Sequence, residues 1–226
     1  MIGIFDSGVG GFCAFREVRR LLPRENILYL ADRRNAPYGT KTKEEIIALT
    51  EADIERLRRL GARKILIACC TASTVYDSLC QKDREIALPI ITPTAEIVAK
   101  SARRVLVIAT DHTARSSAFK NEISRLSQCE VFEMGAQRLV SLVEGGCRDG
   151  RINDECRREI EKIKDKIQEI DADCLILGCT HFSHLEGEFS RITPRIKIIS
   201  PAIEGARALV RSLKQEIIEQ GRIIYS

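Results

Sequence analysis

Two cysteines occupy matching positions in the sequence. Cys69 closes the apolar run that begins at Ile65, and Cys179 closes the run that begins at Leu175. A threonine follows each cysteine within two residues, and a helical pattern comes next. A thiol at the start of a helix feels the positive end of the helix dipole, which lowers its pKa and raises its thiolate fraction. We therefore predict two reactive thiols, although one such cysteine alone would more often be a small buried hydrophobic residue.

Acidic and histidine side chains accompany these cysteines. Asp6 lies in Phe5-Asp-Ser-Gly-Val-Gly-Gly11, where the glycines let the backbone approach a ligand and the following helix offers free N–H groups to an anion. The same residues would also fit a simple turn and helix N-cap. His181 comes two residues after Cys179 and could exchange a proton with its thiol. A zinc ion held by Cys179, His181 and His184 is the alternative, but the cluster offers no clear fourth ligand.

Short apolar runs alternate with longer amphipathic stretches along almost the whole chain. The clearest helix runs from Asp154 to Ile170, where apolar residues recur every three or four positions, and a second runs from Thr42 to Leu60 with Gly61 as its stop. Alternation of this kind predicts the α/β class, with parallel sheets covered by helices. Buried strands are expected at Ile2–Phe5, Ile27–Leu30, Ile65–Ala68, Val105–Ala109, Cys174–Leu177 and Ile196–Ile199.

An internal echo divides the chain into two similar halves. Ile65-Leu-Ile-Ala-Cys-Cys-Thr71 resembles Leu175-Ile-Leu-Gly-Cys-Thr180, which comes half a chain later. Proline-containing stretches at 88–93 and 200–201 are the expected crossings, so that residues 1–92 with 201–226 form one α/β domain and 93–200 form the other. Open parallel sheets bind ligands at the carboxyl ends of their strands. The two domains would therefore face each other across an active-site cleft, with one cysteine on each side.

The composition is that of an ordinary soluble globular protein, with 44% hydrophobic and 30% charged residues and a net charge of +4. No Trp and few other aromatic residues leave no stacking surface for nucleic-acid bases, and the basic cluster from Arg56 to Lys64 is expected to be a solvated helix face. No apolar run approaches the length of a membrane span, and no signal peptide is recognisable. The nine cysteines form no Cys-x-x-Cys pair and indicate a reducing, cytoplasmic setting.

Four motifs, in this order along the chain, resemble those of bacterial glutamate racemase, within the wider aspartate/glutamate racemase group. They are Phe5-Asp-Ser-Gly-Val-Gly-Gly11, Pro37-Tyr-Gly-Thr-Lys41, Ala68-Cys-x-Thr-Ala-Ser73 and Leu177-Gly-Cys-Thr-His181. The resemblance implies two similar α/β domains with the active site between them. It also implies racemisation with no cofactor, neither pyridoxal phosphate nor a metal, and a role in supplying D-glutamate for peptidoglycan.

The resemblance further implies roles for individual residues. Cys69 would remove the Cα proton of the D-isomer and Cys179 that of the L-isomer. Asp6 would support Cys69, while His181 and Glu144 would lie near Cys179. Inversion at Cα needs an acid/base group on each face, and fixed donors must stabilise the charge that develops on the substrate carboxylate. The substrate-binding residues would be Ser7, Tyr38, Gly39, Cys70, Thr71, Thr110, Thr113 and Thr180.

Two departures from the family pattern bear on the substrate. Cys70 stands where the family has asparagine, and a thiol is a poorer hydrogen-bonding group than an amide. The loop Asp32-Arg-Arg-Asn-Ala36 is more basic than the family's. Two alternatives stay open: a racemase for aspartate or another amino acid, and a racemase-like protein that only binds a small ligand or a protein partner. The expected partner is a small amino acid, with no nucleic acid and no membrane, and a homodimer is left open.

Overall fold

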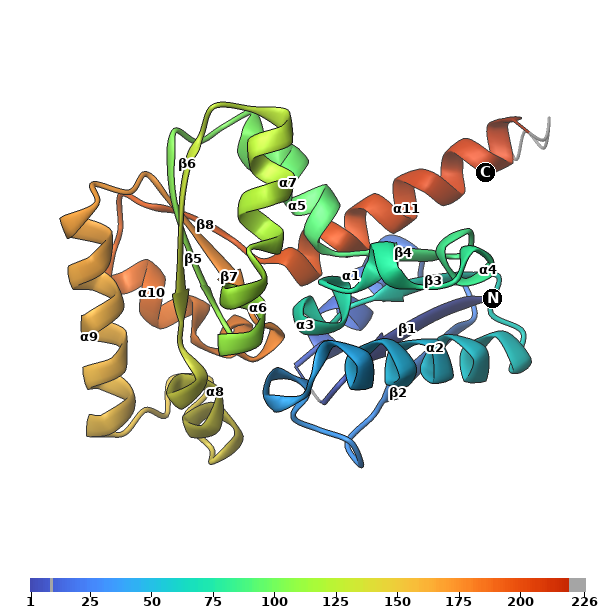
Figure 1. Cartoon of the computed structure of the whole chain (residues 1–226), viewed down its shortest axis with the longest axis horizontal. Coiled ribbons are helices and arrows are strands. Elements are labelled where there is room, and N and C mark those ends of the chain that lie inside the picture. The colour runs from blue at the N-terminus through green and yellow to red at the C-terminus, as the bar shows by residue number, and fades with distance from the viewer. Residues whose placement is uncertain (9, 220–226) are drawn as a thin grey trace.

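The computed structural model describes residues 1–8 and 10–219 and contains two four-stranded sheets (Figure 1). All neighbouring strands in both sheets are parallel. The first sheet has the order β2-β1-β3-β4 and the second the order β6-β5-β7-β8, so the two halves share one connection pattern. The expected α/β class with two similar parallel sheets is thereby confirmed. The strands are β1 (Ile2–Asp6), β2 (Ile27–Ala31), β3 (Lys64–Ile67), β4 (Ala87–Pro89), β5 (Arg104–Ala109), β6 (Glu130–Gly135), β7 (Cys174–Gly178) and β8 (Lys197–Ile199).

The six strands expected from apolar runs are present, and two further strands were missed. The central strands β1, β3, β5 and β7 are almost completely buried because helices cover both faces of each sheet, so their sequences are nearly continuous in apolar residues. β4 has only three residues, and β6 mixes two glutamates with its apolar residues. Both lie at sheet edges, where burial is incomplete and the sequence signal is correspondingly weak.

Helices connect the strands and cover the sheets. α2 begins with a capping box in which Thr42 and Glu45 exchange side-chain and backbone hydrogen bonds, and α9 begins where the Asn153 side chain accepts from the Cys156 backbone at 2.8 Å. The two helices expected at 42–60 and 154–170 are confirmed to within one residue at each end. The helices are α1 (Phe12–Leu21), α2 (Lys43–Arg59), α3 (Cys70–Ser73), α4 (Gln81–Arg84), α5 (Ile91–Ala99), α6 (Asp111–Ser116), α7 (Ala118–Leu126), α8 (Gln137–Glu144), α9 (Asp154–Glu169), α10 (Glu186–Ile192) and α11 (Pro201–Glu219), with 3₁₀ segments η1 (Tyr38–Thr40), η2 (Tyr76–Ser78) and η3 (Thr180–Leu185).

One apolar core runs through both halves. It joins inward-facing residues of both sheets to α1, α5, α7 and α11, and α11 packs along α1 and α5 (Figure 1). The chain passes from the first sheet to the second through α5 rather than through an extended linker at 88–93, and the expected boundary at residue 92 lies inside that helix. The crossing at 200–201 is the start of α11. The division into 1–92 with 201–226 and 93–200 stays a prediction, and 220–226 lie outside the described residues.

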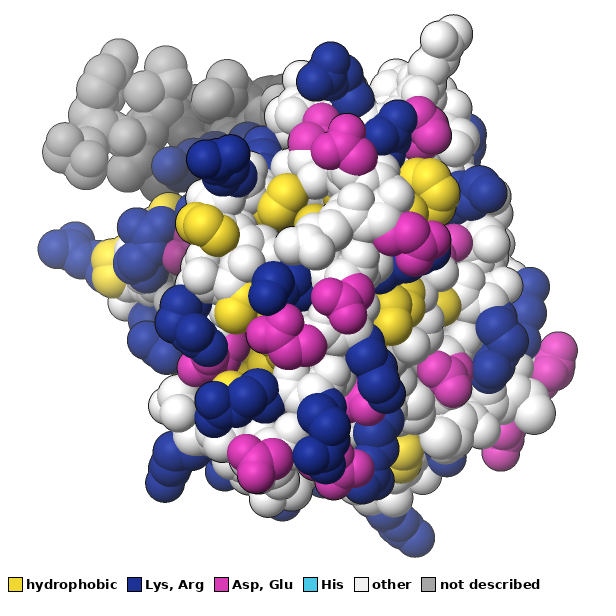
Figure 2. All heavy atoms as spheres, turned by 90° about the vertical axis from the view of Figure 1, so that its left-hand side faces the viewer, with side chains coloured by type: hydrophobic (Ala, Val, Ile, Leu, Met, Phe, Trp, Pro, Cys, Tyr) yellow, Lys and Arg dark blue, Asp and Glu magenta, His cyan; other side chains and the backbone are white. Residues whose placement is uncertain are grey.

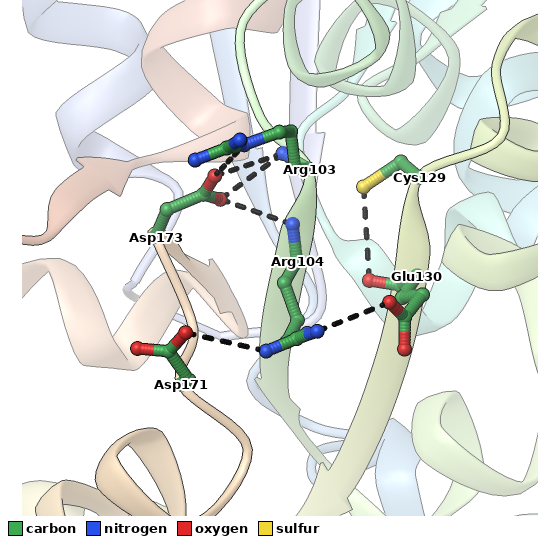
Figure 3. Close-up of polar contacts among 6 residues, drawn as sticks. All are labelled: Arg103, Arg104, Cys129, Glu130, Asp171 and Asp173. Carbon is green, nitrogen blue, oxygen red and sulfur yellow. Dashed lines mark hydrogen bonds and ion pairs between the residues drawn. The ribbon is translucent and has the colours of Figure 1, made fainter.

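The amino edge of the second sheet carries charged ties that hold its strands together (Figure 3). The Asp173 carboxylate accepts from the backbone N–H groups of Arg103 at 3.0 Å and Arg104 at 3.1 Å. The Arg104 guanidinium lies 3.3 Å from both Glu130 and Asp171. Acidic and basic side chains alternate over the outer face of this half, as Figure 2 shows. The ion pairs and backbone hydrogen bonds at the amino edge join β5 to its neighbours, so we assign them a structural role.

Two further predictions concern the surface: that the basic cluster from Arg56 to Lys64 is solvated, and that no segment crosses a membrane. Arg58 and Arg59 both pair with Glu55 on the surface of α2, which agrees with a solvated helix face. Within the described residues, no helix combines the length and the apolar character that a membrane crossing requires.

Candidate active site

The carboxyl ends of the central strands from both sheets surround one small cavity. β1 and β3 of the first sheet, and β5 and β7 of the second, flank the points where the strand order reverses, which is where open parallel sheets bind ligands. The cavity holds about 20 Å³, enough for about one water molecule. Its lining comprises Ser7, Gly8, Ala36, Pro37, Tyr38, Gly39, Cys69, Cys70, Thr71, Thr110, Glu144, Cys179, Thr180 and His181. All sequence-predicted site residues except Asp6 and Thr113 therefore line one cavity that both halves build.

Cys69 follows β3 and caps the short helix α3. Its side chain is 4% exposed, accepts from the Ala72 backbone N–H at 3.4 Å, and lies 3.2 Å from the Ser7 hydroxyl. Burial raises the pKa of the Cys69 thiol to about 11, and the nearby Asp6 carboxylate raises it further than the hydrogen bond from Ser7 lowers it. The resting thiol is therefore protonated at neutral pH.

Cys179 follows β7 at the equivalent place in the second sheet. Its side chain is 6% exposed, and its Sγ lies 3.5 Å from His181 Nδ1. Burial raises the pKa of the Cys179 thiol well above its ordinary value, and the charges of Cys69 and Asp6 act in the same direction. The thiol of Cys69 therefore lies close enough to Cys179 to affect its pKa.

The expectation of a lowered pKa at both thiols is wrong, although the backbone N–H groups of Ala72 and His181 do act in the lowering direction. α3 has four residues, and Cys179 precedes a 3₁₀ segment and makes no side-chain capping bond there. A dipole needs several aligned peptide units to be effective, whereas removing a thiolate from water costs free energy at any buried position. Desolvation consequently outweighs the helix termini at both sites.

Asp6 ties the two halves together behind the cavity. Its carboxylate is fully buried, accepts from the Gly8 backbone N–H at 3.0 Å, and accepts from the Thr180 hydroxyl of the second half at 3.2 Å. The hydroxyl of Ser7, rather than Asp6, contacts the Cys69 thiol. Asp6 therefore acts on Cys69 through its charge and through the position of the loop, and the turn-forming alternative for this residue is compatible with that role.

On the second half, His181 joins Cys179 to a carboxylate. Its Nδ1 lies 3.5 Å from the Cys179 sulfur, and its Nε2 lies 3.4 Å from Glu144. His184 instead pairs with Asp149 at 3.2 Å, so its ring nitrogen is engaged elsewhere. Among the described residues, the potential metal ligands that converge within one coordination sphere are Glu51, Cys80 and Asp83, and Cys179, His181 and His184 do not. The structure therefore does not bring together the three ligands that the zinc alternative requires.

Three threonine hydroxyls form a hydrogen-bonded cluster between the halves. Thr71 lies 3.1 Å from both Thr110 and Thr113, and Thr110 donates to Thr113 at 2.9 Å. Thr113 is fully buried and is not part of the cavity lining. The resemblance implies that it binds substrate, but in the structure it contacts the hydroxyls of Thr71 and Thr110 instead. The cluster fixes the orientation of the two hydroxyls that do line the cavity.

Tyr38 and Gly39 contribute backbone and shape more than a side-chain donor. The Tyr38 hydroxyl lies 2.7 Å from Asp32 and 3.1 Å from Asp53, so it is already engaged by two carboxylates. A Cβ at Gly39 would lie 2.8 Å from the Cβ of Thr110 in the other half, so only glycine permits this approach. Sequence reasoning did not assign Gly8, Ala36 and Pro37 to the lining, although the glycine-rich loop and the proline turn gave a signal for them.

The arrangement can move protons within a small space that is largely shielded from solvent. Two buried thiols lie at equivalent strand ends of two sheets, and hydroxyl and backbone groups surround them. Proton exchange at a carbon atom needs groups of this kind in a place from which water is excluded.

Comparison with known proteins places the chain in a family. The family model described as Asp/Glu/Hydantoin racemase matches residues 14–213. A glutamate racemase from Carboxydothermus hydrogenoformans is 32% identical, with 95% of this chain and 80% of that protein covered. One from Trichodesmium erythraeum is 35% identical, with 94% and 79% covered.

Solved structures agree with this placement. A glutamate racemase from Francisella tularensis in complex with D-glutamate superposes with a TM-score of 0.86 at 27% identity, covering 100% of this chain and 83% of that one. A glutamate racemase isoform from Bacillus anthracis gives 0.87 at 28% identity, covering 96% and 82%. The chain therefore belongs to the Asp/Glu/Hydantoin racemase family and is an isomerase of amino acids.

Proposed function

We propose that this protein interconverts L- and D-glutamate without a cofactor, by proton transfer between two thiols and the substrate Cα. The observation that carries the proposal is the placement of Cys69 and Cys179 at equivalent strand ends of the two sheets, in one closed cavity. The glutamate racemases among the similar proteins support glutamate as the substrate. In a bacterial cytoplasm, the product D-glutamate would serve peptidoglycan synthesis.

The proposed reaction needs one thiolate and one thiol at a time. For D-glutamate, the Cys69 thiolate takes the Cα proton, and the C–H electron pair moves into the substrate carboxylate. The Cys179 thiol then gives its proton to the opposite face of Cα and is left as the thiolate, and the L-isomer follows the reverse course. The raised pKa values suit this task, because a more basic thiolate is a better match for a weakly acidic C–H group.

Neighbouring groups would assist each half of the reaction. The Ser7 hydroxyl can donate to a Cys69 thiolate at its present distance of 3.2 Å. On the other side, Glu144 orients His181, which can hold or release a proton beside Cys179. Hydroxyls of Thr71, Thr110 and Thr180 would bind the substrate carboxylates, as fixed donors that need no reorganisation when charge develops.

A specific observation keeps aspartate as the second candidate substrate. Cys70 is 2% exposed and lines the cavity, where the family pattern expects an amide. A thiol is a weaker hydrogen-bonding group than an amide, so glutamate loses one contact here and its advantage over aspartate is reduced. The homodimer that the sequence left open stays untested.

The test uses single cysteine variants. Cys69→Ala and Cys179→Ala should each lower racemisation by about 10²–10⁴-fold, because each removes the acid/base group of one face. In deuterated water, Cys179→Ala should still exchange the Cα proton of D-glutamate without inverting it, since Cys69 can return a deuteron to the same face.

Cys80→Ala is the matched control, because Cys80 lies outside the cavity lining and should leave the rate unchanged. Full racemisation by either site variant would falsify the two-thiol scheme. Interconversion of aspartate without any of glutamate would overturn the substrate and leave the family reaction in place.

A further inference from the structure

A second, larger cavity opens directly onto the closed one. This cavity, here called the vestibule, holds about 400 Å³. Its lining comprises Gly8, Arg33, Ala36, Val143, Glu144, Arg148, His181 and His184. Gly8, Ala36, Glu144 and His181 line both cavities, so the vestibule is continuous with the space around the two cysteines. A molecule that approaches the thiols from this side must pass it.

Arg33 enters the vestibule from the first half. It belongs to the basic loop after β2 and is exposed. Within the part of the chain that the structure describes, its neighbour Asp32 forms no ion pair with it, and that carboxylate accepts from the Asn35 amide at 2.9 Å and from the Tyr38 hydroxyl at 2.7 Å.

Arg148 enters the vestibule from the second half. It is exposed at the start of a tight turn, where its N–H donates to the Arg151 carbonyl at 2.9 Å. The adjacent Asp149 pairs with His184 at 3.2 Å, and its backbone N–H donates to the His184 carbonyl at 3.1 Å. Glu144, the remaining carboxylate of the vestibule, lies against His181. Over the side chains that the structure describes, neither Arg33 nor Arg148 forms an ion pair.

We propose that the vestibule is an outer anion-binding subsite, in which Arg33 and Arg148 capture a carboxylate of the incoming amino acid before it enters the closed cavity. The inner cavity is too small for an amino acid in the present arrangement. A binding site outside it would hold the amino acid until the inner cavity widens. Guanidinium groups match carboxylates in shape and charge, and two guanidinium groups without an ion-pair partner among the described side chains, on opposite sides of one cavity, would raise the local concentration of anions. The identity of the anion rests on the proposed function, whereas the preference for negative charge does not.

Alkylation of the site cysteines tests the charge preference without using catalysis. Iodoacetate and iodoacetamide attack the same thiol but differ in charge, so the ratio of their rates at Cys69 and Cys179 cancels the thiol pKa and reports the field along the approach. Peptide mass spectrometry separates these two thiols from the other cysteines. In low salt, Arg33→Gln and Arg148→Gln should each lower the iodoacetate-to-iodoacetamide ratio by about two- to tenfold, and the double variant by the product.

Two matched controls come from the same loops. Arg34 and Arg151 are also exposed but lie outside the vestibule lining, and Arg34→Gln and Arg151→Gln should leave the ratio unchanged. Added salt at about 0.5 M should remove the difference between wild type and the vestibule variants, because screening then acts over a few ångströms. An equal fall of the ratio in all four variants, or no fall in any, would overturn the subsite.

Kinetics distinguishes the subsite from the reaction it serves. In Arg33→Gln and Arg148→Gln, KM for glutamate should rise about two- to tenfold at low salt with kcat nearly unchanged, because the capture step precedes the chemistry. If the protein shows the alkylation effect but does not racemise glutamate, the result supports the subsite and contradicts the proposed function. If the protein racemises glutamate but the alkylation ratio is unchanged in the Arg33 and Arg148 variants, the result supports the proposed function and contradicts the subsite.

Discussion

The thiols of Cys69 and Cys179 are nearly inaccessible to solvent, and this accounts for their chemistry. Desolvation is the largest cause of the raised pKa at each thiol, and the Asp6 charge adds to it. A high pKa leaves little thiolate at rest, so the proposed reaction depends on groups that stabilise the thiolate once substrate is bound. The side chains of Ser7 on one side and His181 on the other contact the sulfur atoms, and the Ala72 backbone N–H donates to Cys69 as well.

Cys70 is the residue at which substrate choice can be tested. If the cavity holds glutamate but lacks one amide contact, Cys70→Asn should tighten glutamate binding. A regained hydrogen bond to a charged substrate group is worth about 1.5–3 kcal/mol, or about ten- to a hundredfold in affinity. The measurement is kcat/KM for glutamate and aspartate in both proteins. No gain for glutamate, together with negligible wild-type turnover of it, would rule out glutamate as the substrate.

At the scale of elements, a buried carboxyl group joins α2 to the loop that carries Gly39. Asp53 on α2 is 7% exposed and lies 3.1 Å from the Tyr38 hydroxyl of η1. Burial, with a smaller contribution from the Asp32 charge, raises the pKa of Asp53 from 3.8 to about 7. The folded state thus binds this proton more tightly than the unfolded state does. The stability that Asp53 contributes is complete below the unfolded pKa and is lost as the pH rises through the folded one.

Asp53→Asn should therefore stabilise the protein at pH 8, where the wild-type carboxylate is buried with its charge. We expect the free energy of unfolding in urea to increase by about 1–3 kcal/mol at pH 8 and by less at pH 5. Asp165→Asn, at an exposed position on α9, is the control and should change little at either pH. A gain that is the same at both pH values would contradict the raised pKa.

At the scale of the whole molecule, the two halves approach each other at positions where only glycine fits. A Cβ at Gly10 would lie 2.5 Å from the Thr180 hydroxyl and 2.8 Å from the His181 backbone nitrogen, both in the second half. These contacts adjoin the Asp6–Thr180 hydrogen bond, so the spacing of the halves and the geometry of the cavity depend on the same few atoms.

Gly10→Ala should push the halves apart and separate the two thiols. We expect a loss of about 1–3 kcal/mol in the free energy of unfolding and a larger proportional loss of racemisation, because the site spans both halves. Gly187→Ala on α10, where a Cβ meets nothing within 4 Å, is the control and should keep full activity. Normal racemisation by Gly10→Ala would show that the present spacing of the halves is not required.

The sequence by itself determined the buried strands, the two long helices and the residue types at the strand ends. These features depend on neighbours along the chain. Continuous apolar runs predict strands that are buried on both faces, and apolar residues that recur every three to four positions predict α9. Gly and Asp directly after a strand predict a loop at its carboxyl end. The resemblance of four motifs then brought thirteen candidate residues together, and eleven of them line one cavity.

Only the tertiary structure decided what depends on distant neighbours. The edge strands β4 and β6 form because a partner strand offers hydrogen bonds, a gain that a short or mixed sequence does not reveal. The raised pKa of the Cys69 thiol comes from burial and from Asp6, which is distant in sequence. The hydrogen bond from Thr180 to Asp6 and the contact of Thr113 with Thr71 join the two halves. Desolvation and cross-half hydrogen bonds are set by which surfaces meet, and no local pattern encodes that meeting.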